Sequence, residues 1–430
     1  MYLKISYSGQ QMEAVYREIR NLSFNPETDL VGASVPINEL SVDVLTVGEI
    51  LRGEVCKLYD DLDILWAQYT IVYAEHVDPQ TVHVQARSDV AMLDNRTLPA
   101  TMYDTTADVV VAGIFGNVPY ALHPSFEDVP ISGFCPEQPA RERLAWVCLV
   151  IGAYVKSYFV TTTQIVPLDY TNALVPLERT FWRPSVNYLD YVLSFSVTAY
   201  SYTEGTPQTT DKWVEADGTT YIVETSTMEL APDSVPAGAV GTTMKTDQVQ
   251  LINADNMADV LSRLATYFFK RTEVDAEIIN NGAVLPGDLV TVYTDEDEMM
   301  SGYVQRVEFQ FGNQAKARLH IVGADYVEGA KLTVNYVYNN KSLGRRTYTL
   351  PVGYSYTIPN PYIDKTAGIV RRIYRPTTDA VQGVVDPDGS TEDVEYAVAL
   401  ELENGTLTVV SVDGVEVVTE SDGQRLGAIE

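Results

Sequence analysis

Apolar and polar residues alternate along much of this chain, with the period of two that is typical of half-buried β-strands. Clear examples are residues 39–44, 64–74 and 190–200. Turn signals at residues 60–63 and 78–80 flank the second of these stretches. The pattern predicts a mostly β protein.

Two distant stretches, residues 39–89 and 288–325, repeat one β-pattern. Each begins with an acid and a leucine, continues through a β-branched strand and a crossing strand, and ends at an aspartate (Asp89 or Asp325). The repeat predicts two similar small barrels in one chain. Three such chains would present a sixfold-like surface, which favours assembly over catalysis. On the crossing strands we expect packing or ring contacts from Tyr69, Tyr73, Tyr303 and Phe309.

Four segments are predicted as helices: residues 10–20, residues 107–115 behind a cap at residues 105–108, and residues 141–152 and 253–271, where apolar residues recur at helical spacing. The last has an amphipathic stripe and a cap at Asn253 or Asp255. Residues 118–139 and 234–241 read as loops, and residues 164–168 as a strand.

These elements predict an α+β fold, mostly β, with two similar small β-barrel domains, an intervening mixed α+β domain and a C-terminal all-β module. A length of 430 residues allows three or four domains. We expect a first barrel at 1–110, the mixed domain at 111–230, a helix with the second barrel at 231–328, and the accessory module at 329–430.

The charge of −30, from 59 acidic and 29 basic residues, disfavours nucleic-acid binding, which needs clustered Lys and Arg. An acidic tube lining would instead let a polyanion slide through. Three cysteines without a C-x-x-C motif indicate a reducing compartment and no disulfide framework. We expect no secretory signal and no membrane anchor, because the longest apolar run, residues 144–155, is too short to span a bilayer.

Acidic clusters offer two candidate cation sites. Residues 295–298 are four consecutive acids and read as a solvated hairpin loop. Residues 386–390 resemble a calcium loop, but Ala397 stands where the bidentate glutamate belongs, so we predict an Asp-Gly turn.

The four histidines show no paired ligand spacing. His83 and His320 fall in equivalent strand zones of the two copies, and His123 with Cys135 is a conceivable nucleophile pair without an orienting third group. Nothing selects a glycosidase carboxylate pair among the acids. We therefore expect no enzyme activity and no catalytic, cofactor-binding or metal-binding residues.

Four stretches resemble the tail-hub proteins of long-tailed bacteriophages and related contractile injection machines. They are residues 87–94, 141–168, 177–202 and 253–304. The resemblance covers about residues 1–328. It implies a homotrimeric virion protein whose two barrels per chain form a pseudo-hexameric ring.

That ring would cap the hexameric tail tube and continue its lumen for DNA passage without specific binding. Its implied partners are the tail tube or distal tail protein, the tape measure protein, and the tip or spike with its receptor-binding proteins. The location would be the virion tail, assembled in the bacterial host cytoplasm.

Residues 331–358 resemble a mucin-binding-type β-grasp repeat of bacterial surface proteins. This second resemblance leaves open an adhesin or carbohydrate-binding protein that contacts host-surface glycan through residues 329–430. A cell-wall hydrolase embedded in a tail is a third alternative.

Overall fold

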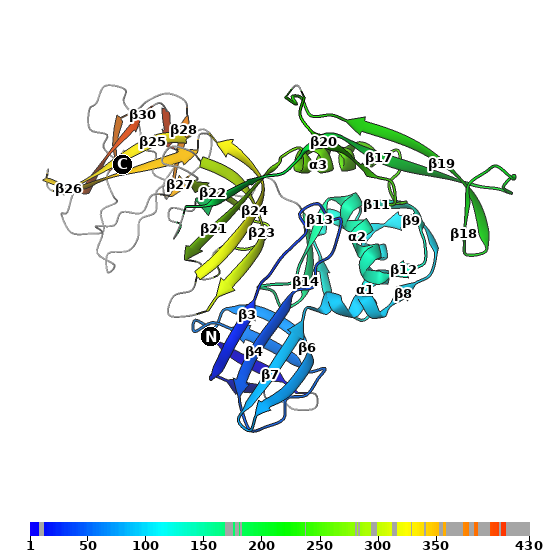
Figure 1. Cartoon of the computed structure of the whole chain (residues 1–430), viewed down its shortest axis with the longest axis horizontal. Coiled ribbons are helices and arrows are strands. Elements are labelled where there is room, and N and C mark those ends of the chain that lie inside the picture. Colours follow the sequence, from blue (N-terminus) through cyan, green and yellow to red (C-terminus); the bar gives the residue numbers. More distant parts are fainter. Residues whose placement is uncertain are drawn as a thin grey trace. The chain divides into compact units, whose positions relative to one another are not determined.

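The computed structural model describes residues 1–7, 13–167, 175–176, 180, 183–236, 238–279, 282, 284–293, 299–311 and 316–327, and the backbone of later strands between 329 and 409 (Figure 1). Strands predominate, so the mostly β α+β fold is confirmed. The chain divides into two compact units. One comprises Met1–Tyr170, Arg179–Asp288 and Gly302–Ala324, and the other Thr171–Glu178, Leu289–Ser301 and Asp325–Glu430. The four-domain division stays a prediction.

The first seven strands form one antiparallel sheet in the order β2-β1-β5-β6-β7-β4-β3 (Figure 1). Buried residues alternate with exposed or half-buried ones along β4, which explains its period of two. The strands are β1 (Tyr2–Ser6), β2 (Ala14–Tyr16), β3 (Ile19–Phe24), β4 (Glu39–Leu45), β5 (Val55–Tyr59), β6 (Leu65–Asp78) and β7 (Thr81–Arg87).

A second sheet has the order β15-β22-β23-β24-β21-β16. Its strands are β15 (Val175–Pro176), β16 (Ser185–Tyr188), β21 (Thr272–Ile279), β22 (Leu289–Tyr293), β23 (Met299–Gln310) and β24 (Lys316–Val327). Both β16 and β24 pair antiparallel with β21.

Five strands of each sheet follow one plan. The order β5-β6-β7-β4-β3 in the first sheet matches β22-β23-β24-β21-β16 in the second, and the matched strands also follow one another in the same order along the chain. We call these five-strand sets the first and second repeat. The predicted duplication is therefore present.

The strand-by-strand alignment predicted from the sequence was wrong at one position. It matched β4 with β22, because both follow an acid–Leu start, whereas the sheet order matches β4 with β21 and β5 with β22. The equivalence depends on which neighbour a strand pairs with, and a short β-branched run does not encode that neighbour.

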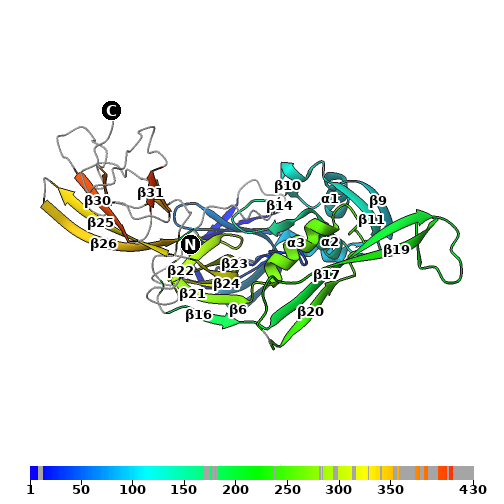
Figure 2. The same ribbon diagram turned by 90° about the horizontal axis from the view of Figure 1, so that it is seen from above.

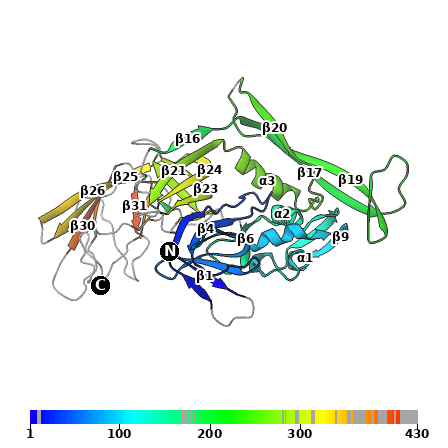
Figure 3. The same cartoon turned by 60° about the horizontal axis from the view of Figure 1, so that its bottom comes forward.

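Residues 89–167 connect the two repeats. They form two α-helices that contact each other (Figure 3) and three small sheets, β10-β14-β13, β11-β9 and β12-β8. The elements are η1 (Asp89–Asn95), β8 (Thr97–Leu98), β9 (Thr101–Thr106), α1 (Ala107–Phe115), β10 (Tyr120–Leu122), η2 (Pro124–Phe126), β11 (Pro130–Cys135), β12 (Gln138–Pro139), α2 (Ala140–Ile151), β13 (Ala153–Lys156) and β14 (Thr163–Pro167).

The helix α1 has the predicted bounds, and α2 ends at Gly152 as expected. Gly152 is left-handed, with φ of 74°, and Arg263 donates to the nearby carbonyl oxygens of Leu149 (2.5 Å) and Val150 (3.1 Å). The predicted loop at 118–139 was wrong in part, because it contains β10, β11 and β12. These strands are short and find their partners far away in the sequence.

An extra sheet is inserted in the second repeat, between β16 and β21. Its order is β18-β19-β17-β20, and β17 with β19 forms a long antiparallel ribbon. The helix α3 packs on β17 (Figure 2). At this contact Phe268 stacks on Phe195 with ring centroids 5.3 Å apart. The elements are β17 (Tyr191–Glu204), β18 (Trp213–Ala216), β19 (Thr219–Leu230), β20 (Gly241–Thr246) and α3 (Met257–Phe268).

The helix predicted at residues 10–20 was wrong. Residues 13–20 hold β2 and the start of β3, and β2 pairs with β1 through Leu3 and Tyr16. Long-range strand pairing overrides the local helical spacing here. The remainder of that prediction, residues 10–12, lies outside the described residues.

The strands after residue 328 form two sheets, ordered β26-β25-β30-β29 and β27-β28-β31. Their bounds are β25 (Gly329–Tyr338), β26 (Lys341–Pro351), β27 (Tyr356–Thr357), β28 (Ile373–Thr377), β29 (Gln382–Val385), β30 (Tyr396–Glu403) and β31 (Thr406–Val409). The turns predicted at 295–298 and 386–390 lie outside the described residues.

Candidate assembly surface

The two repeats are joined by backbone hydrogen bonds. The segment that follows β3 runs antiparallel to β23: the amide of Val307 donates to the carbonyl of Pro26, and the amide of Thr28 to that of Gln305, both at 3.0 Å. Between these bonds, Glu27 and Arg306 form an isolated β-bridge. The first repeat is thus anchored on the long strand of the second.

Aromatic rings fill the same junction. Trp66 on β6 and Phe309 on β23 have ring centroids 4.7 Å apart, and Phe24 stacks on Phe309 at 6.0 Å with an interplanar angle of 7°. Phe159 contacts Trp66 at 4.9 Å. Aromatic pairs of this kind contribute about 0.5–1.5 kcal/mol each beyond their buried area. The cluster therefore holds the two repeats together inside one chain.

A buried amide supports the junction. Asn38 is 2% exposed, donates from Nδ2 to Ser157 Oγ (2.8 Å) and accepts at Oδ1 from the amide of Glu27 (2.7 Å). Its own amide donates to Ser88 Oγ at 3.1 Å. The side chain and backbone amide of this one residue thus tie the segment after β3 to the chain following β7 and β13.

The four predicted contact residues separate into two kinds. Tyr69 and Phe309 are buried, 1% and 5% exposed, and both pack against Phe24. Tyr73 is 42% exposed with its ring edge toward His83, and Tyr303 is half-buried. The first two hold the chain together, while Tyr73 remains accessible to a partner.

Two His–Asp pairs occupy equivalent strand pairs of the two repeats. His83 on β7 lies opposite Asp43 on β4, with Nδ1 2.6 Å from Oδ1. His320 on β24 lies opposite Asp275 on β21, with Nδ1 3.1 Å from Oδ1. The sequence placed both histidines in matching zones but did not identify their aspartate partners.

Hydrogen bonds also shift both carboxyl groups. Burial raises the pKa of Asp43, but hydrogen bonds from His83 and Asn21 lower it more, so the pKa lies below its ordinary value. The pKa of Asp275 is likewise lowered, because His320 and Arg318 outweigh its burial. Both aspartates are therefore ionised at neutral pH and carry charge onto the sheet surface.

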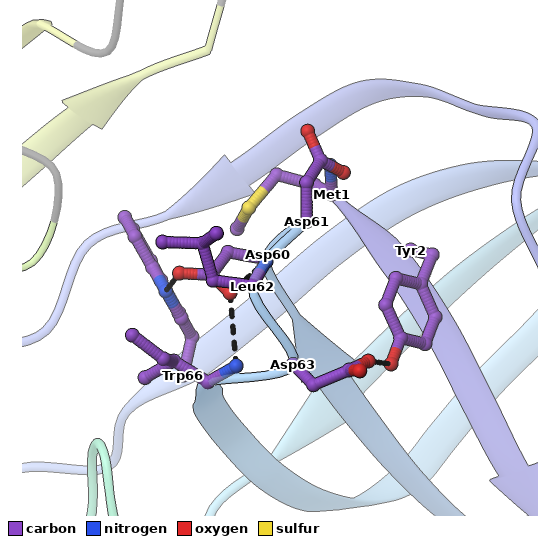
Figure 4. Close-up of polar contacts among 8 residues, drawn as sticks. Met1, Tyr2, Asp60, Asp61, Leu62, Asp63 and Trp66 are labelled. Carbon is purple, nitrogen blue, oxygen red and sulfur yellow. Dashed lines mark hydrogen bonds and ion pairs between the residues drawn. The ribbon is translucent and has the colours of Figure 1, made fainter.

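Residues 60–63, three of them aspartates, form the tip of the β5–β6 hairpin, and Figure 4 shows that the aspartates bind groups of the same chain. Asp60 accepts from the amides of Leu62 and Ile64, both at 2.9 Å, and from the indole of Trp66. Asp63 accepts from the hydroxyl of Tyr2. This cluster closes a turn and does not present a free carboxylate cage.

The Cys–His candidate lacks the geometry of a nucleophile. His123 is exposed and bonds Ser125, while Cys135 is fully buried on β11. Burial raises the pKa of the Cys135 thiol to about 12, whereas nucleophilic cysteines have a lowered pKa.

Across the described residues, no group of three or more His, Cys, Asp or Glu side chains is placed to hold a metal ion. No helix in the described part of the chain is long and apolar enough to cross a membrane.

Sequence comparison finds no protein-family profile and no curated protein that matches the chain. Solved structures do resemble it. The tail protein from Neisseria meningitidis MC58 has a TM-score of 0.50 at 11% identity, covering 75% of this chain and 96% of its own. At that identity the likeness shows the fold alone.

Two further structures fall just below a TM-score of 0.5. The 43 kDa tail protein of prophage MuSo2 from Shewanella oneidensis has a TM-score of 0.49 at 11% identity, covering 75% of this chain and 98% of its own. The prophage tail protein gp18 from Listeria monocytogenes EGD-e has a TM-score of 0.48 at 10% identity, covering 74% of this chain and 94% of its own.

The expected resemblance to phage tail proteins is confirmed at the level of the fold. The second resemblance, of residues 331–358 to a mucin-binding-type repeat, finds no support in these similarities.

Proposed function

We propose that this chain is a structural tail protein, the trimeric hub at the distal end of a phage tail or tail-like injection machine. The observation that carries the proposal is the pair of five-strand repeats with one strand order, fixed to each other within one chain. Three chains with two repeats each present six similar surfaces, which suit a hexameric tube. The fold likeness to a tail protein supports the same role.

In this role the hub joins the tail tube or distal tail protein and the tape measure protein to the tip or spike and its receptor-binding proteins. Its lumen continues that of the tube. The charge of −30 supports passage of DNA without binding, because an acidic lining repels a polyanion. A basic lumen in a reconstructed ring would contradict this part.

The mass of the assembly tests the proposal. Light scattering should give three times the chain mass of 47.6 kDa, and negative-stain images of the same peak should show a central hole with a sixfold-like outline. A particle with twofold or fourfold symmetry, or a chain that stays monomeric at every concentration, would contradict it.

The role is structural and not catalytic. Peptidoglycan zymography of the purified chain should show no clearing. A clearing zone that purified with the chain would instead favour an embedded hydrolase.

A further inference from the structure

The outward faces of the two repeats carry the same arrangement of charge. Every charged side chain at the outward positions of β4 and β21 is an acid, and on the neighbouring strands β7 and β24 the titratable side chains from His83 to Arg87 and from Lys316 to His320 are basic; uncharged residues fill the other outward positions of β4 and β7. The first set is Glu39 and Asp43 beside His83 and Arg87. The second is Glu273, Asp275 and Glu277 beside Lys316, Arg318 and His320.

We call these sets the first and second charge stripe. Within each stripe, acids on one strand form ion pairs with bases on the neighbouring strand: Arg87 with Glu39 (2.7 Å) and Arg318 with Asp275 (2.8 Å). The next strands of the two sheets, β6 and β23, carry acidic and basic side chains on the same strand: Glu75 and His76 on β6, and Arg306 and Glu308 on β23. The separation into one acidic and one basic row is therefore particular to the equivalent strand pairs.

Such a stripe is complementary to a second stripe of the same design. Neighbouring strands lie about 4.8 Å apart, so each stripe is a narrow band with one acidic and one basic edge. Two stripes can be placed face to face so that their acidic strands, β4 and β21, run in the same direction. The acidic strand of each stripe then lies over the basic strand of the other. In that arrangement β4 lies over β24 and β7 over β21. Reversing one stripe would oppose like charges, which disfavours that orientation.

We propose that the first charge stripe of one chain docks on the second charge stripe of another copy, and that this contact closes the ring. The inference rests on the proposed hub function and names the surface through which its copies meet. Charge complementarity between two surfaces of this chain supports a second copy as the occupant. A contact between unlike patches of identical subunits closes into a ring when its rotation permits.

Partial exposure is consistent with a docking surface. Arg87 and Glu39 are 47% and 59% exposed, and Arg318 is 55% exposed, so a partner can reach them. Asp275 and His320 are about one-third exposed and bond each other, which fixes the charge positions before docking. A pre-ordered stripe loses less side-chain entropy on binding than free side chains would.

Charge swaps within one stripe test the contact. The double variant Glu39→Arg/Arg87→Glu keeps an ion pair but inverts its charges in the first stripe, and Glu277→Lys/Lys316→Glu does the same for one pair of the second stripe. Each should weaken self-association by about tenfold or more, because like charges now face each other. The quadruple variant inverts one pair in each stripe and so restores the opposition of acid and base between those pairs; its association should return to within about threefold of the original.

The control is Lys245→Asp/Asp247→Lys, which inverts an ion pair of 2.6 Å at the end of β20, a strand of another sheet than those that carry the stripes. It should leave the association constant, measured by sedimentation velocity, unchanged. Circular dichroism melts establish that each variant folds.

The outcomes separate this inference from the hub proposal. If single-stripe swaps weaken assembly and the quadruple variant does not recover, each stripe contacts some other surface of the neighbouring copy, and the inference is overturned. If every swap assembles like the original chain, the inference fails while the trimeric hub stands. An original chain that never oligomerises overturns both.

Discussion

The rings of Trp66 and Phe309 pack in a tilted arrangement at the junction of the two repeats, with ring centroids 4.7 Å apart and an interplanar angle of 57°. They stand on β6 and β23, the equivalent long strands of the two repeats. One strand of each copy therefore packs directly on its counterpart, which fixes the spacing of two similar surfaces within a chain.

Removing Phe309 should uncouple the repeats. We expect Phe309→Ala to lower the free energy of unfolding by about 3–5 kcal/mol, because the ring is 5% exposed and packs against Trp66 and Phe24. Urea denaturation followed by tryptophan fluorescence would measure this. The control Trp213→Ala, at a side chain 53% exposed, should change it by less than about 0.5 kcal/mol. Equal effects would show that the junction contributes little.

The buried Arg143 should be essential to the fold of the linking region. Its guanidinium is 1% exposed and donates to the carbonyls of Leu98 (3.2 Å), Pro99 (2.8 Å) and Pro136 (2.7 Å). Arg143→Met leaves three acceptors without a donor, so we expect a loss of about 3–5 kcal/mol in the free energy of unfolding, measured by thermal denaturation.

The matched control for that variant is Arg306→Met, which removes an exposed ion pair with Glu308 outside both stripes and should cost at most about 1 kcal/mol. If the Arg143→Met protein were as stable as the Arg306→Met protein, the structural role of the buried arginine would be refuted.

Two aspartates should respond to pH in opposite senses. Burial raises the pKa of Asp89 above its ordinary value of 3.8, partly offset by a hydrogen bond from Thr70. The folded state therefore holds this proton more tightly than the unfolded state, and stability falls as pH rises from 3.8 through the folded pKa. Asp89→Asn should stabilise the protein at pH 7 and have no such benefit below pH 3.8.

Asp43 should behave in the reverse way, since its pKa is lowered. Its contribution is present above 3.8 and is lost as pH falls through the folded pKa, so Asp43→Asn should destabilise at pH 7 and converge with the original chain in acid. Unfolding curves at a series of pH values check both variants, and parallel pH profiles for the two would contradict these assignments.

Gly32 should tolerate no side chain. Its φ is +71°, and an added Cβ would lie 2.7 Å from the carbonyl oxygen of Ala153. Gly53 has φ of +91° with nothing within 4 Å of that position. Gly53→Ala should therefore cost only backbone strain, about 1–2 kcal/mol, whereas Gly32→Ala adds a backbone clash and should cost at least about 3 kcal/mol. Melting temperatures of the pair would measure the difference, and similar values would remove the clash argument.

The sequence pattern predicted well those elements that depend on a few neighbouring residues, such as helix ends and turns. The capping residues 105–108 predicted the bounds of α1, and α2 ends at Gly152 because a left-handed residue suits glycine. The tip at residues 60–63 precedes β6 and the turn at 78–80 follows it, as predicted. For α3 the sequence placed the amphipathic stripe correctly, but the predicted bounds 253–271 and the predicted cap at Asn253 or Asp255 were wrong: the helix runs from Met257 to Phe268 with Asn256 at its N-cap.

Which strands pair with each other depends on residues far apart in the chain, and the sequence pattern did not predict these pairings. The segment expected as a helix at residues 10–20 contains strand β2 because β1 offers a pairing edge. The Asp43–His83 and Asp275–His320 pairs were not anticipated, although acids and bases at alternate positions of strands were a usable signal.

The sequence by itself determined that the chain is mostly β, duplicated and acidic, since periodicity, repetition and charge are properties of the residues in order. Only the tertiary structure decided that β4 corresponds to β21, that Trp66 meets Phe309, and that two charge stripes are built alike. Strand pairing joins residues far apart in the chain, and its free energy depends on the neighbouring strand and the burial that the whole sheet creates.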